Sequence, residues 1–454
     1  SEKITRGEIN MLVNFRFNNF LSYHELSEFS MVTGNVKKHA HHRITFRDTA
    51  VLKFAALYGA NASGKSNLVK AIEFSKEIIL HGINKSITSD KYCKIHTDNK
   101  ENVSNFEYEV VVDDCVYAYG FSVNLFEKVV YKEWLYSLAN NKEEYIFLKE
   151  LKDGVNEIDV NEKYLHLEAT DQMRLKIYVS DLVKKPDSLM LTSLNKEKEK
   201  FYTERDEVSI LNLIFNWFNE KLVVILPEET PKEDGISYLN KDKGMALANF
   251  LDAFGTGIKE ICTMEVHEKD LYTEIPSTLV KGLLEDIRKR ESENITGLLR
   301  TPNNIYQFIK QHGDVRIEIV KFKHNDDTVL YSLGEESDGT VRLVELYDIL
   351  ASDNEKVFVV DELDRSLHPN LTFKFVEYFL EKKNKGQLIV TTHEDRLLDL
   401  AMLRRDEIWF VDKNKEGESY IYSLEKYKER FDKDILKAYL DGRYGSVPKF
   451  KLLS

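Results

Sequence analysis

The chain contains 454 residues, with a formal net charge of −13, 42% hydrophobic residues and three cysteines. This length predicts two or three structural units, and the acidic total disfavours nucleic-acid binding over the whole surface while leaving room for a local basic groove. Because Cys93, Cys115 and Cys262 are widely spaced, a disulfide framework or a structural zinc site is not expected. The apolar runs are much shorter than the ~18 residues of a membrane span, so we expect a cytoplasmic protein without a membrane partner.

The N-terminal segment reads as strands followed by a loop. Apolar and polar residues alternate over residues 11–31, which predicts two strands joined by a bend at 18–23. A charged loop is expected over residues 34–49. Its segment KKHAHH, residues 37–42, raises the question of a metal site, but we favour a solvated loop because no cysteine or spaced carboxylate completes a ligand set.

The segment GANASGKS, residues 59–66, fits the phosphate-binding pattern G-x-x-x-x-G-K-[ST]. It follows a strand-like run and precedes a helix-like run, which is the context that the pattern needs. In such a loop the glycines let the backbone surround phosphate oxygens, the lysine neutralises their charge and the serine hydroxyl binds Mg²⁺. The residues expected to bind ATP here are Gly59, Asn61, Gly64, Lys65, Ser66 and Asn67, with Ser66 also on Mg²⁺.

The middle of the chain contains a strand-like segment followed by a helix-like segment. Residues 106–124 alternate around Asp113 and Asp114, which predicts a β-hairpin. From about residue 165 the sequence is charged and helically periodic, but no heptad pattern lasts long enough for a coiled-coil arm. We therefore expect an α/β fold of two lobes with an antiparallel subdomain and a compact helical insertion. The expected divisions are 1–164 for the N-terminal lobe, 165–328 for the helical insertion and 329–454 for the C-terminal lobe.

Two apolar runs near the C-terminus end in polar residues. The first, VFVVDE, reads as a buried strand followed by Asp361, expected to bind Mg²⁺, and Glu362, expected to polarise the attacking water. The second, QLIVTTH, ends at His393. The intervening length suits one strand–helix–strand crossover, which would bring His393 beside Glu362 at one edge of a sheet.

Ser337 and Gly339 begin an amphipathic run within ESDGT, residues 336–340. A serine and a glycine amide at a helix N-terminus can donate hydrogen bonds to an anion. Composition alone favours a simpler interpretation, a helix N-cap followed by a turn.

The order of these elements resembles the ABC-type ATPases of the branch that contains SMC, RecF and OLD proteins. The loop SLHP at residues 366–369 is also similar to OLD-like members. In that family the Ser-x-Gly signature of one subunit caps the γ-phosphate held by the Walker loop of another. The resemblance therefore implies an ATP-closed homodimer or higher homo-oligomer, in which Ser337 and Gly339 act in trans. It assigns catalysis to Glu362, His393 and Lys65.

The sequence departs from that family in two places. Leu21, within NNFLS, stands where the family's N-terminal Asn-Phe-Arg-Ser motif has arginine. No glutamine occurs between Ser66 and Gln172, so the family's Mg²⁺-coupled glutamine has no match and coupling between the lobes is expected to use another residue. The roughly ninety residues that follow Glu362 are too few for the Toprim nuclease domain of OLD proteins, so we expect none here.

A narrower resemblance rests on four short segments. FGTGI at 254–258, ESDGT at 336–340, RRDEIWFV at 404–411 and YLDGRYGSVP at 439–448 are similar to RloA-like and AbiL-like ATPases of anti-phage abortive-infection operons, relatives of the PARIS system ATPase. The resemblance implies a sensor or scaffold subunit that controls a separately encoded effector, such as a nuclease or toxin.

Two other functions remain open from the sequence. A RecF-like DNA-binding repair ATPase would make nucleic acid a partner, which the acidic composition disfavours. A P-loop small-molecule kinase would need an acceptor pocket and no signature serine acting in trans.

Overall fold

The computed structural model describes residues 9–47, 49–83, 89–139, 142–161, 169–197, 209–227, 241–289, 296–325, 328–351, 355–382 and 385–426. The chain divides into two compact units. Unit 1 comprises Ser1–Val224, Asp353–Leu363 and Leu380–Ser454, and unit 2 comprises Ile225–Ser352 and Asp364–Phe379. These boundaries do not coincide with those expected after residues 164 and 328, so the three-part division of the sequence stays a prediction.

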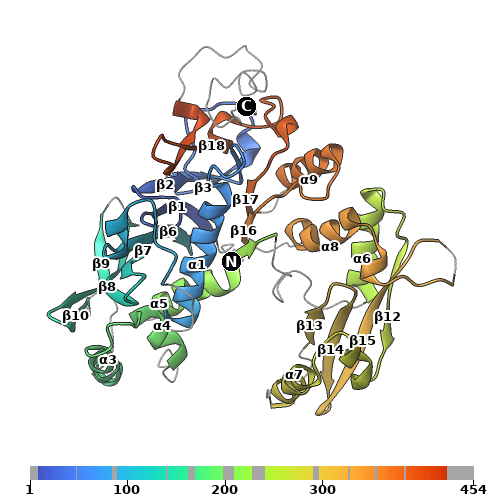
Figure 1. Cartoon of the computed structure of the whole chain (residues 1–454), viewed down its shortest axis with the longest axis horizontal. Helices are drawn as coiled ribbons and strands as arrows, with labels where there is room; N and C mark the ends of the chain where they lie inside the picture. The colour runs from blue at the N-terminus through green and yellow to red at the C-terminus, as the bar shows by residue number, and fades with distance from the viewer. Residues whose placement is uncertain are drawn as a thin grey trace, which may run out of the picture. The chain divides into compact units, whose positions relative to one another are not determined.

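The larger sheet of unit 1 is antiparallel and has seven strands in the order β10-β9-β8-β7-β6-β1-β2 (Figure 1). Its strands are β1 (Met11–Phe17), β2 (Ser27–Ser30), β6 (Ser104–Val112), β7 (Cys115–Asn124), β8 (Val129–Ser137), β9 (Glu144–Lys152) and β10 (Val155–Val160). The expected hairpin is confirmed, because β6 and β7 are joined at Asp113 and Asp114 with φ angles of 50° and 62°. Two successive left-handed residues match the twist of the flanking strands.

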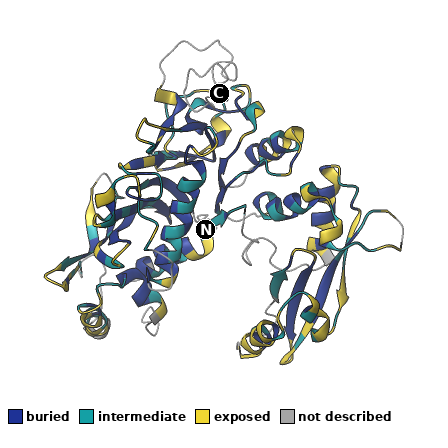
Figure 2. Cartoon of the chain, in the orientation of Figure 1, coloured by how far each residue is buried: buried dark blue, intermediate teal, exposed yellow. Residues whose placement is uncertain are grey.

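The second sheet of unit 1 is mixed, in the order β11-β16-β17-β5-β18-β19. Its strands are β5 (Phe54–Tyr58), β11 (Leu222–Ile225), β16 (Val357–Val360), β17 (Gln387–Thr391), β18 (Ile408–Lys413) and β19 (Ser419–Ser423). Strands β16, β17, β5 and β18 run parallel, and the first three are buried at every residue. The dark colour of β17 in Figure 2 shows this burial. A continuous apolar sequence is what such a strand requires, since both faces are covered.

Helix α1 (Lys65–His81) follows β5 and packs against the seven-stranded sheet. The contact includes Tyr108 of β6, whose hydroxyl lies 2.6 Å from the Ser75 hydroxyl and donates to the Ile72 carbonyl. The crossover from β16 to β17 passes through helix α9 (Pro369–Glu381), as the spacing predicted. The N-terminus of α1 and the start of that crossover therefore lie at the carboxyl edge of the parallel strands.

Gln387, at the start of β17, connects the mixed sheet to β1 of the seven-stranded sheet and to the last residue of the strand Thr49–Leu52. Its side-chain oxygen accepts from the Leu12 amide at 2.7 Å, and its side-chain nitrogen donates to the carbonyls of Leu12 and Leu52 at 3.0 and 2.9 Å. The residue has no exposed surface. A buried amide that satisfies three backbone groups fixes β1 against the mixed sheet.

The prediction of a loop over residues 34–49 is largely wrong. A short 3₁₀ helix at Ala40–His42 leads into a hairpin of β3 (Arg43–Phe46) and β4 (Thr49–Leu52). The hairpin forms because alternate residues enter an apolar cluster with β1. That cluster comprises Ile9, Met11, Val13, Ile44, Phe46, Val51 and Val111. His42 is only 2% exposed, so the solvated loop that we favoured for the histidines is wrong for His42, whereas His41 is exposed and His39 is half-buried.

The helices that follow the seven-stranded sheet in unit 1 are α3 (Ala169–Leu182), α4 (Met190–Thr192) and α5 (Ser209–Asn216). Glu133 of β8 is fully buried and accepts from the amides of Met190 and Leu191 at the start of α4. Burial raises the pKa of Glu133. Among the described helices, none has both the length and the apolar content needed to cross a lipid bilayer.

Unit 2 contains more strand than we expected. Its antiparallel sheet has the order β12-β15-β14-β13. The elements of this unit are α6 (Lys241–Ala253), β12 (Glu260–Glu265), α7 (Ser277–Lys289), β13 (Thr296–Arg300), β14 (Ile305–Gln311), β15 (Asp314–Lys323) and α8 (Asp338–Ala351), with most of α9. Helix α7 covers one face of the sheet through Val280, Leu284 and Ile287. The helical description of residues 165–328 is therefore incomplete.

Candidate active site

The phosphate-loop pattern lies where the sequence predicted it, between β5 and α1. Both ends of the loop require glycine, because neighbouring atoms leave no room for a Cβ. A Cβ on Gly59 would lie 2.4 Å from the Val411 carbonyl oxygen, and one on Gly64 would lie 2.3 Å from the Ser419 hydroxyl. Gly64 also has φ of 116°, a conformation that residues with a Cβ rarely adopt. The loop is thus held tightly against β18 and β19 of the same sheet.

Lys65 is buried, and its side chain folds back over the loop. Its ammonium donates to the carbonyls of Gly59 at 2.6 Å and Ala60 at 3.3 Å. The Ser63 hydroxyl is buried within the loop and has no hydrogen-bond partner among the described residues. An ammonium, a buried hydroxyl and the first amides of α1 together form a set of donors suited to phosphate oxygens.

The N-terminal bend packs against this loop from the seven-stranded sheet. Tyr23 donates to the Gly64 carbonyl at 3.1 Å, Ser22 accepts from the Asn67 side-chain nitrogen at 2.8 Å, and the hydroxyls of Ser22 and Ser419 lie 2.7 Å apart. Ser419 lies 2.6 Å from the Ser63 carbonyl as well. The Asn67 amide is therefore directed towards Ser22, and its expected contact with ATP stays a prediction.

The acidic pair after β16 is organised by a threonine of the neighbouring strand. Thr391 donates from its hydroxyl to Asp361 Oδ1 at 2.5 Å and accepts from the Glu362 amide at 2.8 Å. Its carbonyl accepts from the Leu363 amide at 3.0 Å. Asp361 is 1% exposed, whereas Glu362 is half-buried and has φ of 52°. A non-glycine residue in this left-handed region carries strain and is common at functional sites.

The sheet order places the expected groups at one edge within unit 1. Strand β17 pairs in parallel with both β16 and β5, and the Thr392 amide donates to the Leu57 carbonyl at 3.2 Å. Because the carboxyl ends of parallel strands meet at one edge, the loop that holds Lys65 and the pair Asp361–Glu362 flank the end of β17. Exposed His393 follows β17 and lies at this edge too.

Ser337 and Gly339 lie in unit 2, at the start of α8. The Ser337 hydroxyl accepts from the Thr340 amide at 3.2 Å and lies 2.9 Å from the Thr340 hydroxyl, so Ser337 is an N-cap. A Cβ on Gly339 would come within 3.0 Å of the Ser366 carbonyl, so glycine lets α8 approach the SLHP loop closely. Ser337 is nevertheless exposed and accessible to another molecule.

The site contains residues that the sequence analysis missed. Thr391 was read only as part of a strand, and Ser22, Tyr23 and Ser419 were not assigned to the loop. For Thr391 the signal was available, because a polar residue at the end of a buried parallel strand faces the ends of its neighbours. For Ser419 no local signal exists, since its contact depends on how β19 pairs with β18.

ATP and Mg²⁺ fit the chemistry of these side chains. Lys65 and the α1 amides suit the phosphates, and the oxygen atoms of Ser66 and Asp361 are the hard ligands that Mg²⁺ prefers. The site thus defines a nucleotide-binding P-loop domain of the ATPase type, built on an α/β sheet.

The family follows from the sequence match. Residues 54–178 and 268–399, more than half of the chain, match the family described as "AAA domain, putative AbiEii toxin, Type IV TA system". The chain belongs to this family. The matched ranges contain β5, the phosphate loop, α1, α8, the Asp361–Glu362 pair and His393, and they end before the tail segment at 439–448, which lies outside the described residues.

Solved structures of SMC heads are similar to the chain at low sequence identity. An SMC head bound to the C-winged helix domain of ScpA is 14% identical with a TM-score of 0.39, covering 91% of this chain and 97% of that chain. The SMC head domain from Thermotoga maritima is 13% identical with a TM-score of 0.31, covering 91% and 98%. An SMC head domain with an extended coiled coil, bound to the C-terminal domain of ScpA and derived from Pyrococcus furiosus, is 14% identical with a TM-score of 0.39, covering 96% of this chain and 100% of that chain. No curated protein matches the chain.

Proposed function

We propose that the protein is an ABC-type ATPase that binds and hydrolyses ATP at the carboxyl edge of its mixed sheet. The observation that carries the proposal is the Thr391 hydroxyl, which joins Asp361 to the Glu362 amide beside the strand that leads into the phosphate loop. Asp361 is buried and suits ion binding, whereas Glu362 is half-buried and suits activation of a water molecule.

Each residue has a defined part in this proposal. Lys65 and the α1 amides hold the triphosphate, and Ser66 and Asp361 hold Mg²⁺, which neutralises phosphate charge when bound. Glu362 orients the attacking water and accepts its proton. His393 contacts the γ-phosphate side of the site from the end of β17. Rate acceleration comes from positioning and from fixed charges.

Glu362→Gln tests the assignment of the catalytic base. We expect steady-state ATP hydrolysis to fall at least about a hundredfold, because the amide cannot accept the proton, while ATP binding is kept. The matched control is Glu416→Gln, an exposed residue of the β18–β19 turn, which should hydrolyse ATP normally. Unchanged turnover in Glu362→Gln, measured by phosphate release, would show that the assignment is wrong.

We further propose that two copies close around ATP, with Ser337 and Gly339 of one copy completing the site of the other. Support comes from the exposure of Ser337 at the start of α8, where a helix N-terminus can donate to the γ-phosphate. The Glu362→Gln variant should accumulate as an ATP-dependent dimer, which light scattering can measure.

The proposed biological role is a sensor or scaffold in anti-phage abortive infection, controlling a separately encoded effector such as a nuclease or toxin. It draws on the family description, which mentions the AbiEii toxin and a type IV toxin–antitoxin system, and on the resemblance to RloA-like, AbiL-like and PARIS ATPases. Co-purification with the product of the neighbouring gene tests the role. Expression of the chain by itself should not be toxic, because the effector is another protein.

A further inference from the structure

Three histidines at the start of the β3–β4 hairpin form a cluster that includes none of the residues assigned to the ATP site. His39, His41 and His42 each offer one ring nitrogen, and these three atoms lie within 4.8 Å of one another. The ring centroids of His41 and His39 are 4.3 and 5.0 Å from that of His42. The burial differs, because His42 is buried, His39 is half-buried and the His41 side chain is 51% exposed.

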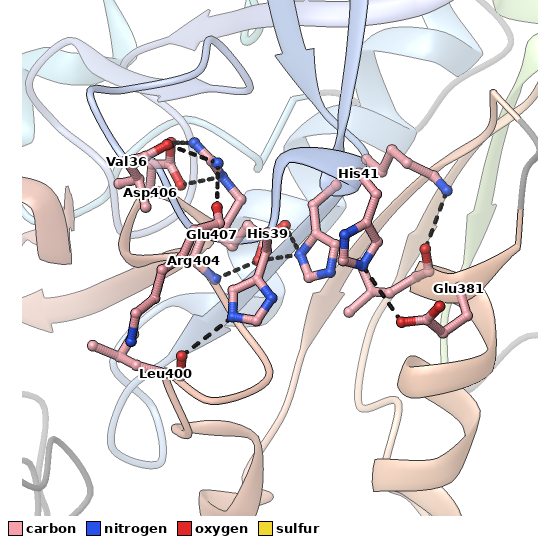
Figure 3. Close-up of polar contacts among 12 residues, drawn as sticks. Val36, His39, His41, Glu381, Leu400, Arg404, Asp406 and Glu407 are labelled. Carbon is pink, nitrogen blue, oxygen red and sulfur yellow. Dashed lines mark hydrogen bonds and ion pairs between the residues drawn. The ribbon is translucent and has the colours of Figure 1, made fainter.

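Each imidazole has an oxygen beside one of its nitrogens (Figure 3). His42 Nδ1 lies 2.9 Å from Glu407 Oε1, His39 Nε2 lies 3.3 Å from the Leu400 carbonyl, and His41 Nε2 lies 3.4 Å from Glu381 Oε1. A carbonyl or carboxylate oxygen only accepts, so a neutral ring keeps its proton on the nitrogen that faces it. The opposite nitrogen then presents a lone pair. Metal-binding histidines have this arrangement of outer acceptors.

The segment that bears the histidines is held in place by buried charges. Arg404 forms a double ion pair with Asp406 and donates to the carbonyls of Val36 and Lys38 at 3.0 and 2.9 Å. The Gly34 amide donates to Asp406 at 2.8 Å, and Lys53 donates to the Lys382 carbonyl at 2.6 Å. Lys53 and Arg404, whose charges act on His42, are therefore both engaged in hydrogen bonds that hold this segment.

We propose that His39, His41 and His42 bind a divalent transition-metal ion of the class that prefers imidazole, with zinc as its representative. Glu407, Leu400 and Glu381 orient the three rings, and water occupies the fourth position of a tetrahedral site. The ion joins the β3–β4 hairpin to the end of α9 and to the segment before β18. This site is independent of the ATP site, whose ligands are oxygen atoms.

A second cluster in unit 1 fits a metal less well. His24, His96 and Glu418 also offer atoms within 4.8 Å of one another. However, the Asn99 side-chain nitrogen donates to the Cys93 carbonyl at 2.9 Å and lies 3.0 Å from His24 Nδ1. His24 Nδ1 must therefore accept, which leaves the proton on Nε2 and removes the lone pair there.

The experiment uses the full chain without a histidine tag, after a chelator has removed bound metal ions. Binding is measured without nucleotide and in a buffer that contains excess Mg²⁺. Zinc binding is followed by calorimetry, and Co²⁺ binding by its visible d–d absorption. We expect one equivalent of each ion and a higher melting temperature with zinc. His41→Gln, at the exposed ring, should lower zinc affinity at least about tenfold, and Glu381→Gln should lower it by about tenfold. Glu377→Gln, one turn earlier on α9, is the matched control and should bind normally.

His96→Gln separates the two clusters and should leave zinc binding unchanged. The proposal is overturned if no stoichiometric ion binds, if His96→Gln abolishes binding, or if His41→Gln binds zinc as tightly as the unmodified chain. None of these outcomes depends on ATP hydrolysis, because the variants are compared by ion binding alone.

Discussion

Thr391 shows how one hydroxyl can organise two acids with different roles. It donates to the Asp361 carboxylate and accepts from the Glu362 amide, so it fixes the proposed ion ligand and the backbone of the proposed base together. The backbone of Glu362 is held at φ of 52°, which costs free energy and persists only because its neighbours enforce it. Glu362 is thereby kept at the carboxyl edge of the sheet.

Thr391→Val should therefore reduce ATP hydrolysis about 10- to 100-fold, the usual effect of removing a group that orients a metal ligand. Valine preserves the shape and the β-strand preference of the side chain, so the fold should remain intact. Thr391→Ser keeps the hydroxyl and should restore most of the activity. Phosphate release at saturating Mg²⁺ and ATP measures the activity of both variants. Equal rates for the unmodified chain and Thr391→Val would contradict the bridging role of the hydroxyl.

At the scale of the elements, the Gln387 side chain links the mixed sheet to two strands that belong to other sheets, β1 and β4. Strand β1 belongs to the seven-stranded sheet and β4 to the hairpin, yet one buried side chain satisfies backbone groups of both. A leucine at this position would have a similar volume but would remove the hydrogen bonds to three buried backbone groups. Each lost hydrogen bond lowers the free energy of unfolding.

Gln387→Leu should lower the free energy of unfolding of unit 1 by about 3 kcal/mol. Tryptophan fluorescence in urea measures this unit specifically, because Trp134, Trp217 and Trp409 all belong to it. Lys413→Leu, at an exposed end of β18, is the control and should change stability by less than about 0.5 kcal/mol. A small effect of Gln387→Leu would mean that the two sheets are joined mainly by apolar packing.

Local chemistry predicted some elements and could not predict others. The turn at Asp113 and Asp114 and the strand at Val357–Val360 follow from short-range patterns, and both are confirmed. The sheet of unit 2 was missed although β13, β14 and β15 pair as successive strands. Its strand β12 pairs with β15 across a long stretch of chain, as in Glu260 with Lys323, and no local pattern indicates that pairing. Burial of His42 depends on Glu407, far along the chain, so composition alone suggested a solvated loop.

At the scale of the whole molecule, the expected site residues are divided between the two compact units. Lys65, Asp361, Glu362 and His393 belong to unit 1, whereas Ser337 and Gly339 belong to unit 2. Two partial sites in one chain can act together within a symmetric pair, where each subunit completes the site of the other. This arrangement would also make hydrolysis depend on protein concentration.

A mixture of two inactive variants tests whether the sites are shared between subunits. Lys65→Ala should lose phosphate binding, and Ser337→Arg should block closure of the facing site, so each should be inactive alone. In an equal mixture half of the dimers are mixed, and each mixed dimer has one site formed by an intact Lys65 and an intact Ser337. Activity should therefore recover to about one quarter of the unmodified level if subunits pair at random by twofold symmetry and the sites act independently. If each chain instead completed its own site, the mixture would stay inactive, and the proposal of catalysis in trans would be wrong.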